Sequence, residues 1–355
     1  MYKVDGKKLI CICILDILKK YTDMDHTLDQ MDIVKKLKSD YDMDADRKTV
    51  KANLMSLLDY GMPLEYTETV RIKKDGSEEI LMSDWYYNHD FDDAELRMLI
   101  DSVLFSKTIP AGQAKSLIEK ITKLSNVYFT GKVKHVSSLP ELSHTDNKQT
   151  LYNVEIIDDA ITKGKKIAFV YNTYGTDKQL HPRRAEKYIV NPYQMVASNG
   201  RYYLVCNYDK YDDLSNYRID RMTDVEILDE KVKDRNEIKA LEKGFNLPKH
   251  MAEHIYMFSD EPETIVLRIK KEAIGEVVDW FGKSFEVLAD SMVKKNYCSK
   301  TDDGYVFIRL SCSHRAMFHW AMQYGTSVEV ISPKSLRDEL KEAVSNMLKA
   351  YTETI

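Results

Sequence analysis

The chain has 355 residues, of which 31% are charged and 43% hydrophobic, with only 13 glycines and 8 prolines. This balance excludes a disordered or fibrous protein, and the length favours two or three domains, because one hydrophobic core rarely serves so many residues. The net charge of −5 argues against a protein that coats DNA nonspecifically, but it allows a specific regulator in which only the contacting face is basic.

Residues 7–20 predict a helix. Apolar residues at helical spacing are Leu9, Ile10, Ile14, Ile17 and Leu18. Asp16 interrupts the apolar stretch, lysines follow it, and no small-residue cleavage site is present, which favours a helix over a signal peptide. No apolar run reaches the roughly 18 to 20 residues that span a bilayer. We therefore expect a cytoplasmic protein with no membrane partner.

Two more helices and a hairpin complete residues 1–90. The second helix starts near Thr27, a plausible N-cap, and carries an apolar stripe. The third is capped by Asp44 or Asp46 and stops at Gly61. Alternating residues on both sides of Asp75-Gly76 then predict a β-hairpin. Three short helices followed by a hairpin are typical of a winged helix-turn-helix DNA-binding domain.

The third helix has an apolar side and a polar side. Val50, Leu54, Leu57 and Leu58 point inward, while small and polar residues occupy the opposite face. That face suits a DNA major groove, although a solvated helix face is the simpler explanation. The wing favours DNA, since its basic residues can reach neighbouring phosphates. Lys48, Thr49 and Asn53 are expected to read bases, and Arg47, Lys51, Arg71, Lys73 and Lys74 to hold phosphates.

Residues 91–150 predict a connector. Two amphipathic helices over 91–129 are separated near Pro110 and Gly112, and such connectors often pack against a symmetry mate. The following residues, to about 150, are polar and lack periodicity, so we expect a linker there.

The remaining chain predicts two further domains. Residues 151–232 begin with a short helix to Lys163 and continue with six short strands, which favours a small, strongly bent β-barrel. Residues 233–355 follow the order β-α-β-β-α-β of ferredoxin-like domains and end in an amphipathic helix that starts at Pro333 as its first residue. The predicted fold is thus multidomain α+β.

Cysteine and histidine patterns predict no cofactor and no metal. The five cysteines, an odd number, form no disulfide framework, and the one close pair is C-x-C, whose members face different sides of a helix. We expect them to be buried as small apolar residues. They are Cys11, Cys13, Cys206, Cys298 and Cys312. The nine histidines form no metal-binding pattern.

The segment "RYYLVCNYD", together with "FVY", "VNPYQMV" and "YRIDRM", resembles the WYL-domain family of bacterial transcriptional regulators. The naming tripeptide stands here as Tyr202-Tyr203-Leu204, with Tyr in place of Trp. The family's arginine pattern is present as Arg218-Ile219-Asp220-Arg221, and its preceding proline as Pro192. The resemblance implies an N-terminal winged helix-turn-helix, a central Sm-like WYL barrel and a C-terminal extension called WCX.

The resemblance also implies a pocket in which aromatic and arginine residues surround an anionic effector, either a nucleotide or single-stranded nucleic acid. The candidate residues are Tyr171, His181, Arg183, Tyr203, Arg218 and Arg221. Alternation puts Tyr202 and Tyr203 on opposite faces of one strand and leaves open which face fills the barrel, although Tyr202 is assigned to the core. The two arginines have a simpler alternative role, pairing with Asp220 or Glu226 at the surface.

Two functions follow, from different classes. The leading hypothesis is a ligand-responsive regulator that binds a palindromic double-stranded operator as a homodimer. The alternative is a nucleic-acid-binding accessory protein of a phage-defence or CRISPR locus. We expect no enzyme, because the sequence offers no paired nucleophile and base, no glycine-rich phosphate loop and no metal-ligand cluster. Arg315, His319 and Trp320 of the C-terminal domain fit ordinary helix packing; that domain's role as dimer surface, second sensor or lid stays open.

Overall fold

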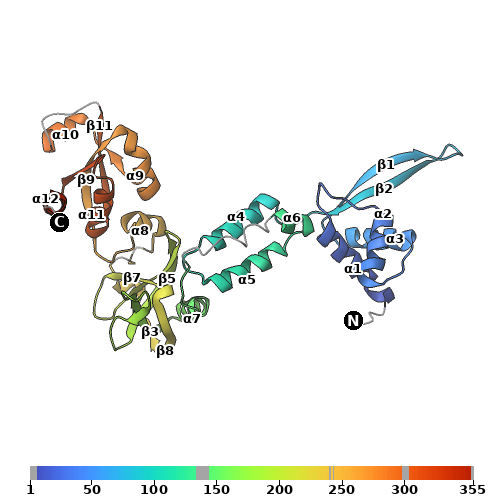
Figure 1. Ribbon diagram of the computed structural model, residues 1–355, viewed down its shortest axis with the longest axis horizontal. Coiled ribbons are helices and arrows are strands. Elements are labelled where there is room, and N and C mark those ends of the chain that lie inside the picture. Colours follow the sequence, from blue (N-terminus) through green and yellow to red (C-terminus); the bar gives the residue numbers. More distant parts are fainter. Residues whose placement is uncertain (1–5, 133–143, 240, 243, 298–303, 353–355) are drawn as a thin grey trace. The chain divides into compact units, whose positions relative to one another are not determined.

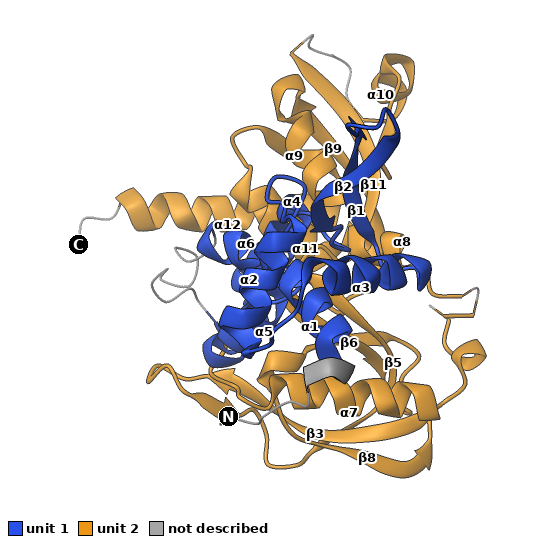
Figure 2. Cartoon of the chain, turned by 90° about the vertical axis from the view of Figure 1, so that its right-hand side faces the viewer, with its two compact units in different colours: residues 1–144 blue, residues 145–355 orange. Residues whose placement is uncertain are grey.

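The computed structural model describes residues 6–132, 144–239, 241–242, 244–297 and 304–352 (Figure 1). Cys298 and much of the predicted linker lie outside these ranges. The chain divides into two compact units, 1–144 and 145–355, coloured separately in Figure 2. The fold is mixed α/β and multidomain. Every helix in the described ranges is too short or too polar to traverse a lipid bilayer.

The first unit opens with a head of three helices and a hairpin. Its elements are α1 (Gly6–Tyr21), α2 (Gln30–Tyr41), α3 (Arg47–Asp59), β1 (Leu64–Ile72) and β2 (Glu78–Tyr87). The apolar stripes of the three helices meet in one core, in which Ile17, Leu37 and Leu54 are fully buried beside Trp85 of β2. Leu9 is an exception to the predicted apolar face, because 39% of it is exposed.

Helix caps correct one prediction and decide another. Thr27 does not cap α2: the N-cap is Asp29, whose side chain accepts from the amide of Asp32. The cap thus lies two positions further along the chain, a shift that local pattern cannot exclude because both side chains are good caps. Asp46 rather than Asp44 caps α3. Beyond α3, Gly61 has a φ of +92°, a conformation that favours glycine.

A helical connector completes the first unit. It consists of α4 (Asp93–Leu104), α5 (Ala111–Thr122) and the short α6 (Val127–Lys132). Helix α4 begins with a capping box formed by Asp92 and Glu95. Leu96, Ile100, Ile118 and Phe129 are among the buried residues that pack the three helices together. Helix α6 was not predicted separately, because its pattern runs on from α5 in the sequence.

The second unit starts with α7 (Thr150–Lys163) and a six-stranded curled sheet. The strands are β3 (Lys165–Tyr174), β4 (Leu180–Pro182), β5 (Tyr188–Ser198), β6 (Arg201–Asn207), β7 (Leu214–Arg218) and β8 (Met222–Lys231). Their order is β4-β3-β5-β6-β7, and β8 also pairs with β3. Six strands were predicted over this stretch, at nearly these positions.

The two faces of β6 have different surroundings. Leu204 and Cys206 are fully buried in the core that α7 covers, and Tyr202 packs against the same core. Tyr203 belongs to the opposite face, where it packs beside Val205 and Met257. The question that strand alternation left open is thereby answered: the Tyr202 face fills the curled sheet.

The rest of the second unit contains a four-stranded antiparallel sheet of order β10-β11-β9-β12. A connecting segment with α8 (Leu247–Glu253) precedes it. The elements are β9 (Pro262–Lys270), α9 (Ile274–Phe281), β10 (Glu286–Val287), α10 (Asp290–Asn296), β11 (Tyr305–Ser313), α11 (His314–Gln323), β12 (Val328–Ser332) and α12 (Lys334–Thr352). Trp320 is fully buried in its core, whereas Arg315 and His319 are exposed.

Two details of this sheet differ from the sequence-based expectation. The predicted strand at 284–290 is reduced to the two residues of β10, and α10, which follows it, was not predicted. Pro333 lies just before α12 rather than at its first position, and its carbonyl accepts from the amide of Arg337. Helix boundaries shift by one or two residues easily, since the flanking residue is only half helical.

Candidate functional site

Basic and aromatic side chains meet where β6, β7 and the turn after β7 come together. Antiparallel pairing places Tyr203 of β6 opposite Arg218 of β7. Arg201 lies two residues before Tyr203 and so shares its face of the strand. Asp220 and Arg221 follow in a single 3-10 turn, Ile219–Arg221. We call Arg201, Arg218, Asp220 and Arg221 the arginine cluster.

A buried carboxylate organises the arginine cluster. The Asp220 side chain is only 2% exposed. Arg218 grips it with two hydrogen bonds, from Nε to Oδ1 at 3.0 Å and from Nη2 to Oδ2 at 2.6 Å. Nη1 of Arg201 lies 3.5 Å from the same Oδ2. The bidentate geometry fixes the guanidinium plane of Arg218, and one carboxylate cannot neutralise three arginines, so the cluster keeps an excess of positive charge.

Burial and mutual repulsion shape the protonation of these groups. Burial and then the neighbouring Arg218 lower the pKa of Arg201. Burial also acts against the charged form of Arg218, but Asp220 outweighs it and the pKa of Arg218 is raised. For Tyr203 and Tyr171, burial raises the pKa more than the arginines lower it. Both phenols therefore stay protonated at neutral pH and can donate hydrogen bonds to an anion.

Arg221 differs from the other two arginines. Its Nε is buried and has no hydrogen-bond partner in the described part of the chain. Its guanidinium lies 5.9 Å from the centre of the Tyr174 ring, at the outer limit of a cation–π contact. A buried donor without a partner is costly, so this Nε is a poorly satisfied donor of the cluster.

The other predicted pocket residues fall into two groups. Tyr171 lies beside the cluster, and the backbone of Arg218 bonds its hydroxyl. His181 is exposed and its Nε2 is 2.7 Å from Oδ2 of Asp177. Arg183 is also exposed, and its backbone amide, not its guanidinium, bonds the carbonyl of Tyr171. The structure thus brings together Tyr171, Tyr203, Arg218 and Arg221, but not the side chain of His181.

Two members of the site were missed or placed in a lesser role by sequence reasoning. Arg201 was not selected, although strand alternation from Tyr203 puts both on one face. Asp220 was considered only as a surface partner, and its pairing with Arg218 is instead buried. Glu226, the other suggested partner, pairs with Lys187 at 3.0 Å.

Of the α3 side chains that were predicted to contact DNA, some are exposed and others are bonded within the protein. Lys48, Thr49 and Lys51 are exposed. Nε of Arg47 donates to the buried Gln30 at 2.7 Å. The Asn53 amide donates to the Thr49 carbonyl of its own helix at 2.8 Å. These bonds restrain both side chains, so contact with DNA is left to the Nη groups of Arg47 and to the Oδ1 atom and second amide hydrogen of Asn53.

The hairpin of β1 and β2 is less basic than its tip suggests. Arg71, Lys73 and Lys74 are exposed, but residues 64–87 contain three basic and six acidic residues. Arg71 stands opposite Glu79 in the strand register. Only the tip, where the three basic residues gather, is suited to phosphate contact.

Fold and site together define a mixed α/β, multidomain protein with a basic cluster on its curled sheet. Residues 152–227 match the model of the WYL domain, and residues 261–348 match that of the WCX domain. The arginine cluster lies inside the first of these matches. The chain therefore carries a WYL domain followed by a WCX domain.

Individual relatives are distant. YobV of Bacillus subtilis (strain 168), an uncharacterized HTH-type transcriptional regulator, is 24% identical over 208 residues, or 59% of this chain and 58% of that protein. The match thus spans less than two thirds of the relative. Among solved structures, proteasome accessory factor B/C of Arthrobacter aurescens is 14% identical, with a TM-score of 0.30 over 98% of this chain and 49% of that one. A CRISPR Cas-related protein is 15% identical, with a TM-score of 0.36 over 97% and 84%.

Proposed function

We propose that the protein is a DNA-binding transcriptional regulator whose WYL domain senses an anionic ligand. The observation that carries the proposal is the arginine cluster, in which one buried carboxylate orients two arginines and leaves positive charge in excess. Tyr203 and Tyr171 add phenol donors beside it. This arrangement supports recognition of a phosphate group on a nucleotide or a single strand of nucleic acid, since arginine binds phosphate in a bidentate way.

In this proposal α3 reads the operator. Lys48 and Thr49 approach base edges, and Lys51 and the wing tip hold phosphates. The protein acts as a homodimer, so that two copies of α3 meet two half-sites about one helical turn apart. YobV is named as an HTH-type transcriptional regulator, and this name supports a DNA-binding role for the present chain.

The finer fold names form part of the same proposal. Three helices with a hairpin support a winged helix-turn-helix head. The curled six-stranded sheet supports an Sm-like barrel, and the order β10-β11-β9-β12 supports a ferredoxin-like WCX domain. The protein binds its ligand without turnover and acts in the cytoplasm. Consumption of a nucleotide by the purified protein would contradict the first of these statements.

The test is a fluorescence-anisotropy titration with the duplex upstream of the protein's own gene. It is repeated with a short single-stranded oligonucleotide as competitor and as direct ligand. We expect tight, salt-sensitive duplex binding that the oligonucleotide modulates without displacing the duplex. Binding to the single strand alone would instead favour an accessory protein of a defence locus.

A variant separates the sensor from the head. Arg201→Ala with Arg221→Ala removes two ligand arginines and leaves the Arg218–Asp220 pair intact. We expect the response to the oligonucleotide to be abolished and duplex affinity to be unchanged. Lys210→Ala, which removes an exposed charge elsewhere in the same domain, is the control and should behave as the wild type. Loss of duplex binding in the double variant would show that the sensor assignment is wrong.

A further inference from the structure

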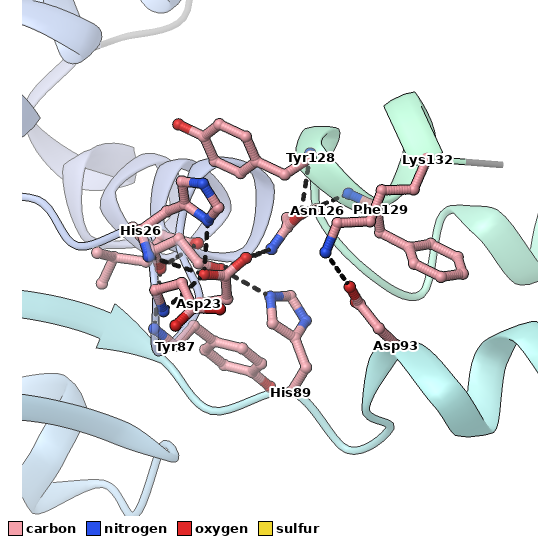
Figure 3. A network of polar contacts seen from close by, with 12 residues as sticks. Asp23, His26, Tyr87, His89, Asp93, Asn126, Tyr128, Phe129 and Lys132 are labelled. Atoms are coloured by element: carbon pink, nitrogen blue, oxygen red, sulfur yellow. Dashed lines mark hydrogen bonds and ion pairs between the residues drawn. The ribbon is translucent and has the colours of Figure 1, made fainter. Parts of the chain in front are cut away.

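A dense polar network joins the head to the helical connector inside the first unit (Figure 3). At its centre is Asn126, which directly precedes α6 and is 3% exposed. Its Nδ2 donates to the carbonyl of Thr22 at 3.2 Å and to Oδ2 of Asp23 at 2.6 Å. Thr22 and Asp23 belong to the turn between α1 and α2. One side chain of the connector is therefore bonded directly to the helix-turn-helix.

The other end of the same amide caps α6. Oδ1 of Asn126 accepts from the amides of Tyr128 at 2.9 Å and Phe129 at 3.1 Å. An asparagine side chain offers two donor hydrogens and two acceptor sites, and here all four are used. A buried amide with every position filled has one favourable orientation, because each bond that opens leaves a buried group unpaired.

Neighbouring groups fix the turn from other directions. Oδ1 of Asp23 accepts from the His26 amide and from Nδ1 of its ring, both at 2.8 Å. The His26 ring stacks on Tyr128 of α6, with centroids 3.6 Å apart and planes 9° from parallel. Nε2 of His89, which follows β2, lies 3.0 Å from the Thr22 carbonyl. The end of the wing and α6 thus converge on the turn at residues 22–26.

A salt bridge extends the network into the connector. Nζ of Lys132 at the end of α6 lies 2.6 Å from Oδ2 of Asp93 at the start of α4. Phe129 of α6 is buried with Leu96 and Ile100 of α4. Helix α6 is therefore held by the head at one end and by α4 at the other.

We infer that the head, residues 6–89, and the connector, residues 93–132, move as one rigid body, and that Asn126 is the positioning residue that locks them together. A displacement of α4 and α5 is then transmitted undiminished to α3, because the joint between connector and head does not absorb it. Under the proposed function, on which this last step rests, ligand binding in the other unit changes DNA affinity by shifting the whole of this body.

The test measures the distance between two nitroxides by pulsed electron–electron double resonance, because the width of the distance distribution reports how rigid the joint is. Nitroxides are attached through encoded non-natural residues at Lys35 of α2 and Glu119 of α5, which are exposed, so that the native cysteines are left untouched. Labelled protein is mixed with an excess of unlabelled chain, so that a homodimer carries at most one labelled copy, and we then expect one narrow distance distribution in the wild type. A broad or multiple distribution in the wild type would overturn the inference without reference to any variant.

Asn126→Asp tests the locking role. It keeps the oxygen acceptors that cap α6, but it replaces both donors by a second carboxylate beside Asp23. We expect the distance distribution to broaden, while the far-ultraviolet circular dichroism of the full chain stays the same because the helices are retained. Asn88→Asp, the same exchange at an exposed asparagine near the wing, should leave the distribution narrow. An unchanged distribution in Asn126→Asp would mean that the residue does not lock the joint.

A compensating exchange guards against misfolding of the single variant. Asp23→Asn combined with Asn126→Asp restores the amide–carboxylate hydrogen bond with the roles reversed, without the bond to the Thr22 carbonyl, and it should narrow the distribution relative to that of Asn126→Asp. Failure of this recovery, in a double variant that folds, would count against the lock. None of these measurements needs DNA or ligand, so failure of the proposed function and failure of the rigid joint are distinguished.

Discussion

The arginine cluster and the outer face of α3 are both basic candidate sites, yet they hold their charge in opposite ways. In the cluster, Arg218 is 15% exposed and its partner Asp220 is 2% exposed. On α3, Lys48 and Lys51 are exposed to solvent. A buried charge is held in one orientation by partners whose removal destabilises the fold, whereas an exposed charge has little influence on the fold and is screened by salt. The comparison separates a preorganised site from one that is organised only upon binding.

The largest effect is expected from removing the carboxylate of the cluster. Asp220→Ala leaves two guanidinium groups without their counter-charge, which should cost about 3–5 kcal/mol. Hydrogen exchange of the β6 and β7 amides measures this opening free energy. The control is Asp212→Ala, whose carboxylate is 74% exposed and pairs with Lys233, and which should cost at most about 1 kcal/mol. Equal losses of opening free energy in Asp220→Ala and Asp212→Ala would contradict the distinction between buried and exposed charges.

A smaller effect is expected on ligand affinity. Nη1 of Arg201 lies 3.5 Å from Oδ2 of Asp220, which is a long contact. The other guanidinium hydrogens of Arg201 therefore remain as donors for a ligand. Arg201→Ala should cost about 1.5–3 kcal/mol of binding to a phosphorylated ligand, the contribution of a charge-assisted hydrogen bond. Isothermal titration with a short oligonucleotide measures the difference. An unchanged affinity would remove Arg201 from the site.

His314 of the C-terminal domain is intermediate in exposure between the buried Arg218–Asp220 pair and the exposed lysines of α3. Its side chain is 33% exposed. Its Nδ1 lies 2.5 Å from Oε1 of Glu263, and its Nε2 lies 2.8 Å from Oε2 of Glu339. Both nitrogens can donate only in the imidazolium form. Burial lowers the pKa of His314, but the two glutamates outweigh it, and the pKa is raised above its ordinary value of 6.5.

The sign of the pH dependence follows. With a folded pKa above the unfolded one, the stabilisation is fully present below pH 6.5 and is lost as the pH rises through the higher folded value. Urea unfolding followed by tryptophan fluorescence, to which Trp280 and Trp320 contribute from this domain and Trp85 from the head, should therefore show the domain weakening from mildly acidic to alkaline pH. His314→Gln should flatten this part of the profile. A wild-type profile that rises over the same range would contradict the imidazolium bridge.

The smallest effect on stability is expected on α3. Lys48→Ala and Lys51→Ala should change the free energy of unfolding by less than about 0.5 kcal/mol. For each lysine that binds a phosphate, its removal should reduce the slope of the logarithm of duplex affinity against the logarithm of salt by about 0.9. Anisotropy titrations at several salt concentrations measure this slope. Lys123→Ala, exposed elsewhere in the same unit, should leave it unchanged, and an equal reduction there would mean that the charge acts nonspecifically.

Much of the fold follows from local pattern, and the remainder depends on partners distant in the sequence. Helical spacing predicted the buried Ile17 and Leu54, and alternation predicted the six strands, because burial of one face imposes these periods. The short β10 exists through its pairing with β11, which no local period encodes. Asn126 lies within the range predicted for the second connector helix, and no local pattern shows that the fold brings Thr22 to its side chain. Arg201 could have been selected from its alternation with Tyr203, but its approach to Asp220 depends on the turn that follows β7.

The uneven charge of the head has a consequence for how it meets a polyanion. Helix α3 begins with Arg47 and Lys48, while residues 64–87 of the hairpin carry twice as many acidic as basic residues. Such a body has an electric dipole, and the field of a duplex exerts a torque on it before the two molecules touch. Under the proposed function, the acidic stem of the hairpin is repelled by the duplex, which disfavours approach through that stem. Added salt therefore weakens the orientation of approach together with the attraction.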